Sequence, residues 1–212
     1  GLKMTISKIE DAIDAIRRGE MIVVVDDESR ENEGDIVIAA DAAEQKDIAF
    51  MMNHARGLVC MAMEGDRLDE LEIPLLVARN TAPLKTAFTV SVDYIPGTTT
   101  GISAADRAAT VRALAKGDAK PDDFARPGHI FPLRAHPEGV RSRPGHTEAA
   151  VELARLAGRA PSGVICEVAN DDGTMSRLPQ LEVFAEKHGL LIVTIEDLVA
   201  YLNATAKVNV AA

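Results

Sequence analysis

The chain has 212 residues, of which 47% are hydrophobic and 26% charged, and its formal net charge is −10. This composition is close to the globular average and supplies enough apolar side chains for a sizeable core. The negative charge excludes a general nucleic-acid-binding protein, which needs a broad positive surface. No apolar run approaches the length of a membrane span, and we expect neither a membrane partner nor a signal peptide.

We expect one domain over residues 1–212, because no repeat, low-complexity linker or break in composition divides the chain. Residues 1–3, which precede Met4, are expected to be left over from cloning or from a cut within a longer protein. The two cysteines, Cys60 and Cys166, each lie in an apolar stretch. This pattern is typical of buried free thiols in a reducing compartment, and it predicts a cytoplasmic protein.

Six helices are predicted from capping residues, apolar faces and terminating glycines. The first begins at a capping box formed by Ser7 and Glu10 and ends at Gly19. In chain order, the others run from Asp41 to Gly57, from Ser103 (with Asp106) to Leu114, from Thr147 to Leu156, from about Pro179 to His188, and from Thr194 to Leu202.

Strands are predicted between these helices. Continuous apolar runs, as expected of strands buried on both faces, occupy residues 21–25, 36–40, 58–63, 163–168 and 190–194. The segment Phe88 to Tyr94 instead alternates between apolar and polar residues. The interleaving of strands and helices indicates an α/β or α+β domain with a mixed sheet and helices on its faces.

A dense acidic segment follows the first strand. Residues 26–35 (DDESRENEGD) contain six acids and one arginine, Arg30. Carboxylates at this density repel one another unless a cation lies among them, and their oxygens suit magnesium, manganese or calcium. An EF-hand is excluded, because with Gly34 at the glycine position the bidentate glutamate would be Ala40. A solvated acidic turn remains the alternative to a site.

A basic segment precedes the fourth helix. Four of the ten prolines fall within residues 126–150, which predicts a stiff, extended loop and not a regular element. Free N–H groups at the helix start, the Thr147 hydroxyl and Arg143 together make a phosphate site. His146 beside them can ligate a metal or carry a proton. The alternative is an ordinary capped helix with a surface arginine and a structural histidine.

Two further observations narrow the chemistry. No Walker A or GxGxxG pattern occurs, so neither nucleoside triphosphate nor dinucleotide binding is supported. Glu167 lies in the apolar run VICEV. A carboxylate there costs several kcal/mol, on the order of 2 or more, unless it has partners, so it marks either a site with a raised pKa or a structural salt bridge.

Taken together, these segments resemble the 3,4-dihydroxy-2-butanone 4-phosphate synthase family of riboflavin biosynthesis. The resemblance runs from Ile9 to Tyr201. It rests on five motifs in order: DDESRENEGD (26–35), TTGISAADR (99–107), RPGHIFPLRA (126–135), RPGHTEAAV (143–151) and CEVANDDGTMSR (166–177).

The resemblance implies a three-layer α/β fold and a magnesium-dependent lyase, with manganese as a substitute metal. Its substrate would be ribulose 5-phosphate, converted to the four-carbon ketone phosphate and formate by enolisation, dehydration, skeletal rearrangement and release of carbon 4. Such chemistry needs a divalent ion, groups that move protons in turn and an anchor for the phosphate.

The family pattern also assigns residues. Glu31 and His146 would be the magnesium ligands. Arg30, Glu31, Asp35 and Glu167 would contact the substrate, and a cradle for its phosphate would comprise Arg143, Pro144, Gly145, His146 and Thr147. His129 and Glu167 are the positions essential to the chemistry, and Asp35 and Glu33 are further catalytic candidates. Glu33 and Asp27 are candidates for a second metal or for proton transfer.

The resemblance implies a homodimer with active sites at the subunit interface. Residues 80–86 match the mobile active-site loop, although Ala82 and Leu84 depart from its more polar composition. Three alternatives stay open: a non-catalytic ion- or anion-binding module, an inactive subunit, and a different sugar-phosphate isomerase or lyase. Formate release separates the last from a synthase, because isomerases make none.

Overall fold

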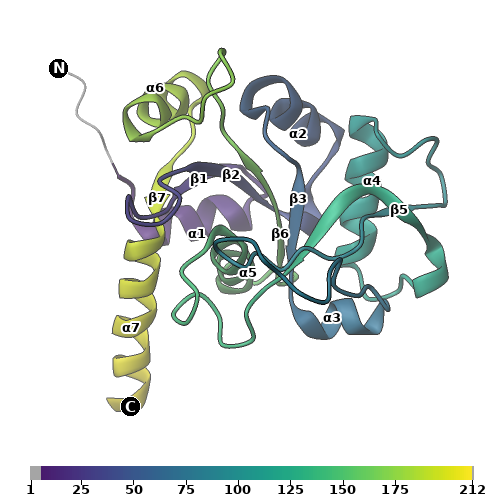
Figure 1. Ribbon diagram of the computed structural model, residues 1–212. Coiled ribbons are helices and arrows are strands. Elements are labelled where there is room, and N and C mark those ends of the chain that lie inside the picture. The colour runs from purple at the N-terminus through teal and green to yellow at the C-terminus, as the bar shows by residue number, and fades with distance from the viewer. Residues whose placement is uncertain (1–5, 212) are drawn as a thin grey trace.

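The computed structural model describes residues 6–211, so residues 1–3, expected to come from cloning or from a cut within a longer protein, lie outside the described part. Within that part, seven strands form one mixed sheet in the order β4-β5-β3-β6-β2-β1-β7 (Figure 1). The strands are β1 Ile22–Val25, β2 Gly34–Ala39, β3 Cys60–Met63, β4 Val92–Tyr94, β5 Phe124–Arg134, β6 Ser162–Glu167 and β7 Ile192–Thr194. The α-helices are α1 Ile9–Arg17, α2 Gln45–Phe50, α3 Gly65–Glu70, α4 Ala104–Ala115, α5 His146–Leu156, α6 Leu178–His188 and α7 Ile195–Ala211.

The sheet is covered by helices on both faces, which confirms the predicted three-layer α/β fold. Alternate residues of a strand point to opposite faces. Val23 and Val25 of β1 pack in the core formed with α2, α4 and α6, whereas Ile22 and Val24 pack with α1, α5 and α7. The central strands are therefore apolar throughout, as the continuous runs predicted.

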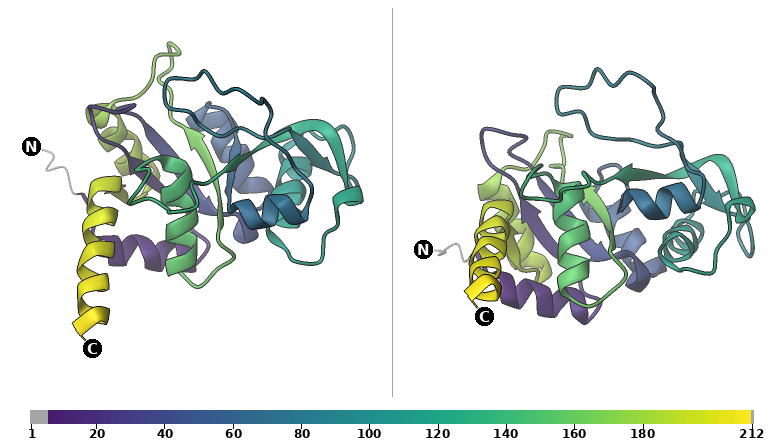
Figure 2. Two further views of the ribbon diagram at one scale, coloured as in Figure 1. Left: turned by 60° about the horizontal axis from the view of Figure 1, so that its bottom comes forward. Right: turned by 90° about the horizontal axis from the view of Figure 1, so that it is seen from below.

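The strand directions bring three segments from different parts of the chain to the same end of the sheet. β2 pairs antiparallel with both β1 and β6, so the end of β1, the start of β2 and the end of β6 lie together. Asp35 of β2 is the register partner of Glu167 of β6. The β1–β2 loop and the long α3–β4 loop project from the same side of the molecule (Figure 2, right).

Three predicted helix starts are wrong. The N-cap of α1 is Lys8, not Ser7, whose backbone N–H bonds to Ile192 O at 2.8 Å and continues the extended chain. α2 begins four residues after Asp41, at a capping box of Glu44 and Asp47, because Asp41 is occupied by an ion pair with Arg159.

The third error concerns α5, whose N-cap is Gly145 and not Thr147. Thr147 is the second residue of the helix, so its side chain does not cap the start. The cap of α4 is confirmed, because Ser103 accepts from Asp106 N at 3.0 Å. Gly189 ends α6 in the left-handed region at φ 67°, also as predicted.

The proline-rich segment is not a loop throughout, because its first part is strand β5. Pro132 keeps its place in the ladder as an acceptor, receiving bonds from Thr89 N and Oγ1 at 3.0 and 2.8 Å. β4 pairs Val92 with Ile130 but Asp93 with Ala125, so residues 126–129 bulge out between them. Proline is tolerated in strands where no backbone N–H is needed, which the sequence prediction did not allow for.

The predicted strand over Phe88 to Tyr94 is regular only in its last three residues, those of β4, with isolated bridges at Phe88 and Thr89. Within residues 6–211, no helix is both long enough and apolar enough to span a bilayer.

Candidate active site

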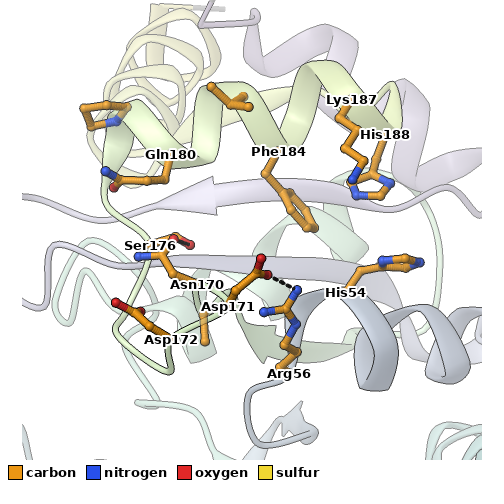
Figure 3. A pocket seen from close by; sticks show the side chains of 13 residues that line it. His54, Arg56, Asn170, Asp171, Asp172, Ser176, Gln180, Phe184, Lys187 and His188 are labelled. Carbon is orange, nitrogen blue, oxygen red and sulfur yellow. Dashed lines mark hydrogen bonds and ion pairs between the residues drawn. The ribbon is translucent and has the colours of Figure 1, made fainter.

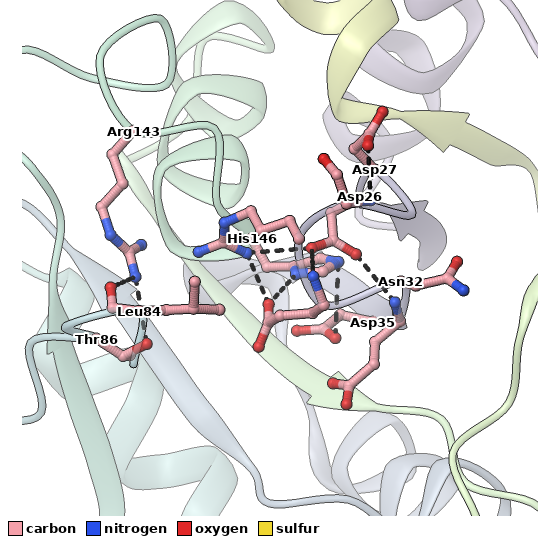
Figure 4. A network of polar contacts seen from close by, with 12 residues as sticks. Asp26, Asp27, Asn32, Asp35, Leu84, Thr86, Arg143 and His146 are labelled. Atoms are coloured by element: carbon pink, nitrogen blue, oxygen red, sulfur yellow. Dashed lines mark hydrogen bonds and ion pairs between the residues drawn. The ribbon is translucent and has the colours of Figure 1, made fainter. Parts of the chain in front are cut away.

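The acidic β1–β2 loop and the start of α5 meet at His146 (Figure 4). His146 is the first residue of α5, and its side chain is 5% exposed. Its Nε2 lies 3.1 Å from Val24 O, which can only accept, so this nitrogen carries a proton. Its Nδ1 lies 3.3 Å from Glu31 Oε1. The contact joins residues far apart in the sequence.

Asp26 fixes the conformation of the acidic loop. Its carboxylate accepts from the backbone N–H groups of Glu31 and Glu33, both at 2.9 Å, and from Arg30 Nη1 at 3.2 Å. Sequence reasoning counted this buried acid among the six but gave it no role. Its position in the sequence could have predicted this role, because Asp26 is the first acid after a buried strand, where the backbone N–H groups of a loop need acceptors.

Two guanidinium groups approach the start of α5. Arg30 Nη1 lies 2.7 Å from Glu31 Oε1, and Arg143 Nη1 donates to Glu148 Oε1 at 2.7 Å. A Cβ on Gly145 would come within 2.6 Å of Arg143 Nη1 and 2.7 Å of Arg30 Nη2. Only a residue without a side chain leaves both cations room beside the free N–H groups of the helix, an arrangement that suits an anion.

Buried carboxylates gather on the other side of His146. Asp35 Oδ1 is buried, has no hydrogen-bond partner among the described residues and lies 3.8 Å from His146 Nε2. Burial, together with the charges of Glu167, Glu31 and Glu33 and against that of His146, raises the pKa of Asp35 to about 7. Burial likewise raises the pKa of Glu167 and that of Glu33. Groups with raised pKa values can move protons near neutral pH.

The Glu31–His146 pair has the opposite character. The hydrogen bond from His146 lowers the pKa of Glu31 to about 2, against the effect of burial. Burial would lower the pKa of His146, but Asp35, Glu31 and Asp26 outweigh it and raise it to about 9. Glu31 is therefore held as an anion while its neighbours on the strands are held closer to neutrality.

These groups line a cavity of about 130 Å³ between the loop, α5 and the strand ends. Of the predicted site residues, the lining includes Arg30, Glu31, Glu33, Asp35, Arg143, His146, Thr147 and Glu167. Thr86, the last residue of the predicted active-site loop, also lines the cavity, and the lining residues that sequence reasoning missed are Leu58, Cys60, Phe88, Leu133 and Ile165. They are apolar or weakly polar, so no charge pattern marked them.

His129, Asp27, Pro144 and Gly145 were predicted but do not line the cavity. His129 lies on the β5 bulge, with its Nδ1 2.8 Å from Asp93 Oδ2 and its backbone N–H donating to Asp93 Oδ1 at 2.7 Å. Its side chain is 41% exposed. Asp27 is also exposed, and it accepts from Ser29 N at 2.8 Å.

The predicted active-site loop, residues 80–86, contacts Arg143. Arg143 Nη2 donates to Leu84 O at 3.0 Å and to Thr86 Oγ1 at 3.2 Å. Asn80 Nδ2 closes the loop by donating to Thr86 O at 2.9 Å. Because Leu84 makes its contact through the backbone carbonyl, its apolar side chain does not prevent the loop from reaching this cation.

A larger cavity, of about 760 Å³, lies between residues 54–56, which follow α2, residues 169–176 and α6 (Figure 3). Its charged groups include an Arg56–Asp171 ion pair at 2.6 Å, in which the Asp171 side chain is 96% exposed. It lacks the convergent, buried carboxylates of the smaller cavity. Chemistry, and not size, therefore identifies the smaller cavity as the candidate active site.

The residues beside the cavity fit a hard divalent cation. Ligand atoms of Asp26, Glu31 and His146 lie within 4.8 Å of one another. The partnerless Asp35 Oδ1 close by is a further acceptor without a donor. Carboxylate oxygens with one imidazole suit magnesium or manganese. Since the Asp26 oxygens already bind backbone N–H groups, Glu31 and His146 are the freer donors.

The fold and the site define the class of this chain: an α/β enzyme whose cavity is lined by a carboxylate cluster and a pair of arginines. Residues 10–201 match the sequence model of the 3,4-dihydroxy-2-butanone 4-phosphate synthase family. A protein of that name from Agrobacterium fabrum is 76% identical over 200 residues, covering 94% of each chain. One from Pseudomonas aeruginosa is 55% identical, and this chain spans 54% of its length.

Solved structures give the same result. A 3,4-dihydroxy-2-butanone 4-phosphate synthase in complex with two magnesium ions superposes with a TM-score of 0.91 at 47% identity, covering 94% of this chain and 98% of that one. A two-domain synthase from A. baumannii gives a TM-score of 0.89 at 52% identity, over 92% of this chain and 57% of that one. The chain belongs to the 3,4-dihydroxy-2-butanone 4-phosphate synthase family, as its motifs predicted.

Proposed function

We propose that the chain converts D-ribulose 5-phosphate to 3,4-dihydroxy-2-butanone 4-phosphate and formate, as one catalytic domain. The observation that carries the proposal is the convergence of Glu31, His146, Asp35, Glu167 and the Arg30–Arg143 pair on one small cavity. The reaction removes one carbon as formic acid and leaves a four-carbon ketone phosphate. The atoms balance without an oxidant or a reductant, so the acids, bases and cations of the site can serve the reaction.

Glu31 and His146 would hold magnesium, with manganese as a substitute. The relative solved with two magnesium ions supports this choice of metal. When bound, the ion would stabilise negative charge on the vicinal oxygens of the sugar. Asp26 keeps Glu31 in place by binding its backbone N–H.

The chain's own residues would divide the remaining work. Arg30, Arg143 and the first N–H groups of α5, within the cradle of residues 143–147, would bind the phosphate. Asp35 and Glu167 face each other across β2 and β6, and their raised pKa values suit groups that accept and return protons. Glu33 is a second candidate for proton transfer, and Asp27 a more distant one.

His129 would act from the second subunit of a homodimer. Its side chain is partly exposed and lies outside the cavity of its own chain, so a site that uses it needs another copy. The α3–β4 loop beside the cavity exposes Leu75, Leu76 and Val77 at 51, 55 and 50%. A run of exposed apolar side chains next to a site supports an interface there.

The two cysteines support a location for this activity. Cys60 and Cys166 are free and buried, which supports a cytoplasmic enzyme.

The direct test is to mix the purified protein with ribulose 5-phosphate and magnesium and to follow formate by proton NMR. We expect formate with magnesium and none after treatment with EDTA. Isomerised sugar without formate would instead identify an isomerase, and binding without turnover an inactive subunit.

A matched pair of variants tests the ligand role. Glu31→Gln removes the charge beside His146. We expect it to lower kcat by at least about a hundredfold while the protein remains folded. Glu28→Gln changes an exposed acid of the same loop and should leave activity unchanged. Full activity in a folded Glu31→Gln protein would remove Glu31 from the ligands.

A further inference from the structure

Glu148 is a buried carboxylate beside the cavity to which neither the sequence motifs nor the proposed chemistry gives a role. It is the third residue of α5 and is 2% exposed. Its Oε1 accepts from Arg143 Nη1 at 2.7 Å, and its Oε2 accepts from His136 N at 2.8 Å. A buried carboxylate is costly unless it is paired in this way, so its presence calls for a reason.

The consequence of the Glu148 contact appears at Arg143, whose side chain is 19% exposed. Arg143 uses Nη1 for Glu148 and Nη2 for Leu84 O and Thr86 Oγ1. A guanidinium has five N–H donors in one plane. The remaining two, on Nε and Nη1, have no acceptor among the described residues and are available to an anion.

The geometry around Gly145 shows where that anion would lie. The ends of Arg143 and Arg30 and the Oε1 atom of Glu148 all come within 2.9 Å of a Cβ built on Gly145. Glu148 thus anchors one guanidinium within reach of the other and of the helix start. An arginine held in advance loses less entropy on binding a phosphate than a free one.

We propose that Glu148 is a positioning residue for phosphate binding, which it promotes by holding Arg143 at the start of α5. The inference rests on the proposed function in one respect, that the substrate's phosphate binds Arg143. It differs from a purely structural role, in which Glu148 would only bind the His136 backbone. In that case its effect would not depend on Arg143.

A double-mutant cycle separates these two roles. The variants are Glu148→Gln, Arg143→Ala and the double variant, and the probe is inorganic phosphate, whose affinity is measured by calorimetry without turnover. KM and kcat for ribulose 5-phosphate are measured in parallel. We expect Glu148→Gln to weaken phosphate affinity and to raise KM on the order of tenfold, with a smaller change in kcat.

In the Arg143→Ala background, Glu148→Gln should change neither phosphate affinity nor KM further. Glu148→Asp keeps the charge on a shorter side chain and should restore part of the affinity, which also provides a folded variant if Glu148→Gln is unstable. The matched control is Glu152→Gln, one turn further along α5, where Glu152 pairs with Arg155. It should leave phosphate affinity unchanged.

Two results would overturn the proposal: unchanged phosphate affinity in folded Glu148→Gln, or an equal loss with and without Arg143. Failure of the proposed function would look different. If the protein releases no formate, but Glu148→Gln weakens phosphate affinity only when Arg143 is present, the positioning role holds and the proposed reaction fails.

Discussion

At Gly145 the missing side chain, and not an unusual backbone, allows two arginine side chains to approach the start of α5. Its φ of −105° is open to any residue, yet a Cβ would meet two arginine ends and the Glu148 carboxylate within 2.9 Å. These are flexible side-chain ends, so the fold can accommodate alanine while the cations move. A shift of this kind acts on binding geometry more than on stability.

Gly145→Ala is therefore expected to raise KM on the order of tenfold, with little change in melting temperature. Steady-state kinetics and a thermal melt check both parts. Gly158→Ala is not a suitable control, because its φ of 75° adds backbone strain, whereas Gly117→Ala meets no atom within 4 Å and should leave KM unchanged. An unaltered KM in Gly145→Ala would mean that the two arginines do not need this space.

The thiols of Cys60 and Cys166 are expected to be unreactive in the native protein. Burial raises the pKa of Cys166 to about 12 and that of Cys60 further, so the thiolate is scarce at pH 8. Alkylation should be negligible under native conditions and complete in denaturant, as judged by mass spectrometry. Rapid modification of Cys60 in the folded protein would show that the cavity is more open to solvent than described.

At the scale of elements, helix α4 and helix α1 make a matched comparison. Ser103 caps α4 through its hydroxyl, whereas Ser7 precedes Lys8, the true N-cap of α1, and makes no side-chain bond among the described residues. Ser103→Ala should cost about 1 kcal/mol and lower the melting temperature by roughly 2–4 °C. Ser7→Ala should leave the melting temperature unchanged. Equal losses in the two variants would restore Ser7 as a cap.

The errors at this scale share one physical cause. Ser7, Asp41 and Thr147 have the residue types that favour helix caps, but tertiary partners decided otherwise. Ser7 is held by Ile192 and Asp41 by Arg159, and two arginine ends lie where a side chain on Gly145, the N-cap of α5, would project. Long apolar runs predicted the strands well because burial on both faces leaves few alternatives.

The sequence predicted those site residues that lie in densely charged segments. Arg30, Glu31, Asp35 and His146 lie in dense charged segments, and the structure places them together. Asp26 and Glu148 escaped because their function is to hold backbone or another side chain, which sequence spacing does not reveal. His129 was predicted as a site residue, but its position relative to the cavity depends on assembly.

At the scale of the whole molecule, the dimer hypothesis predicts complementation between two inactive variants. Glu31→Gln and His129→Ala damage opposite contributions to a shared site. When they are refolded together, half of the dimers are mixed and each has one intact site, so about a quarter of wild-type activity should return. No recovery, with mixed dimers shown to form, would place His129 in the site of its own chain.

The central claim is the reaction itself, and ribulose 5-phosphate labelled with carbon-13 at C4 tests it most directly. Carbon NMR of the products with magnesium present should show the label in formate and an unlabelled four-carbon ketone phosphate. Label that stays in the sugar product, or formate that arises only from a C1-labelled substrate, would contradict the proposed rearrangement and release of carbon 4.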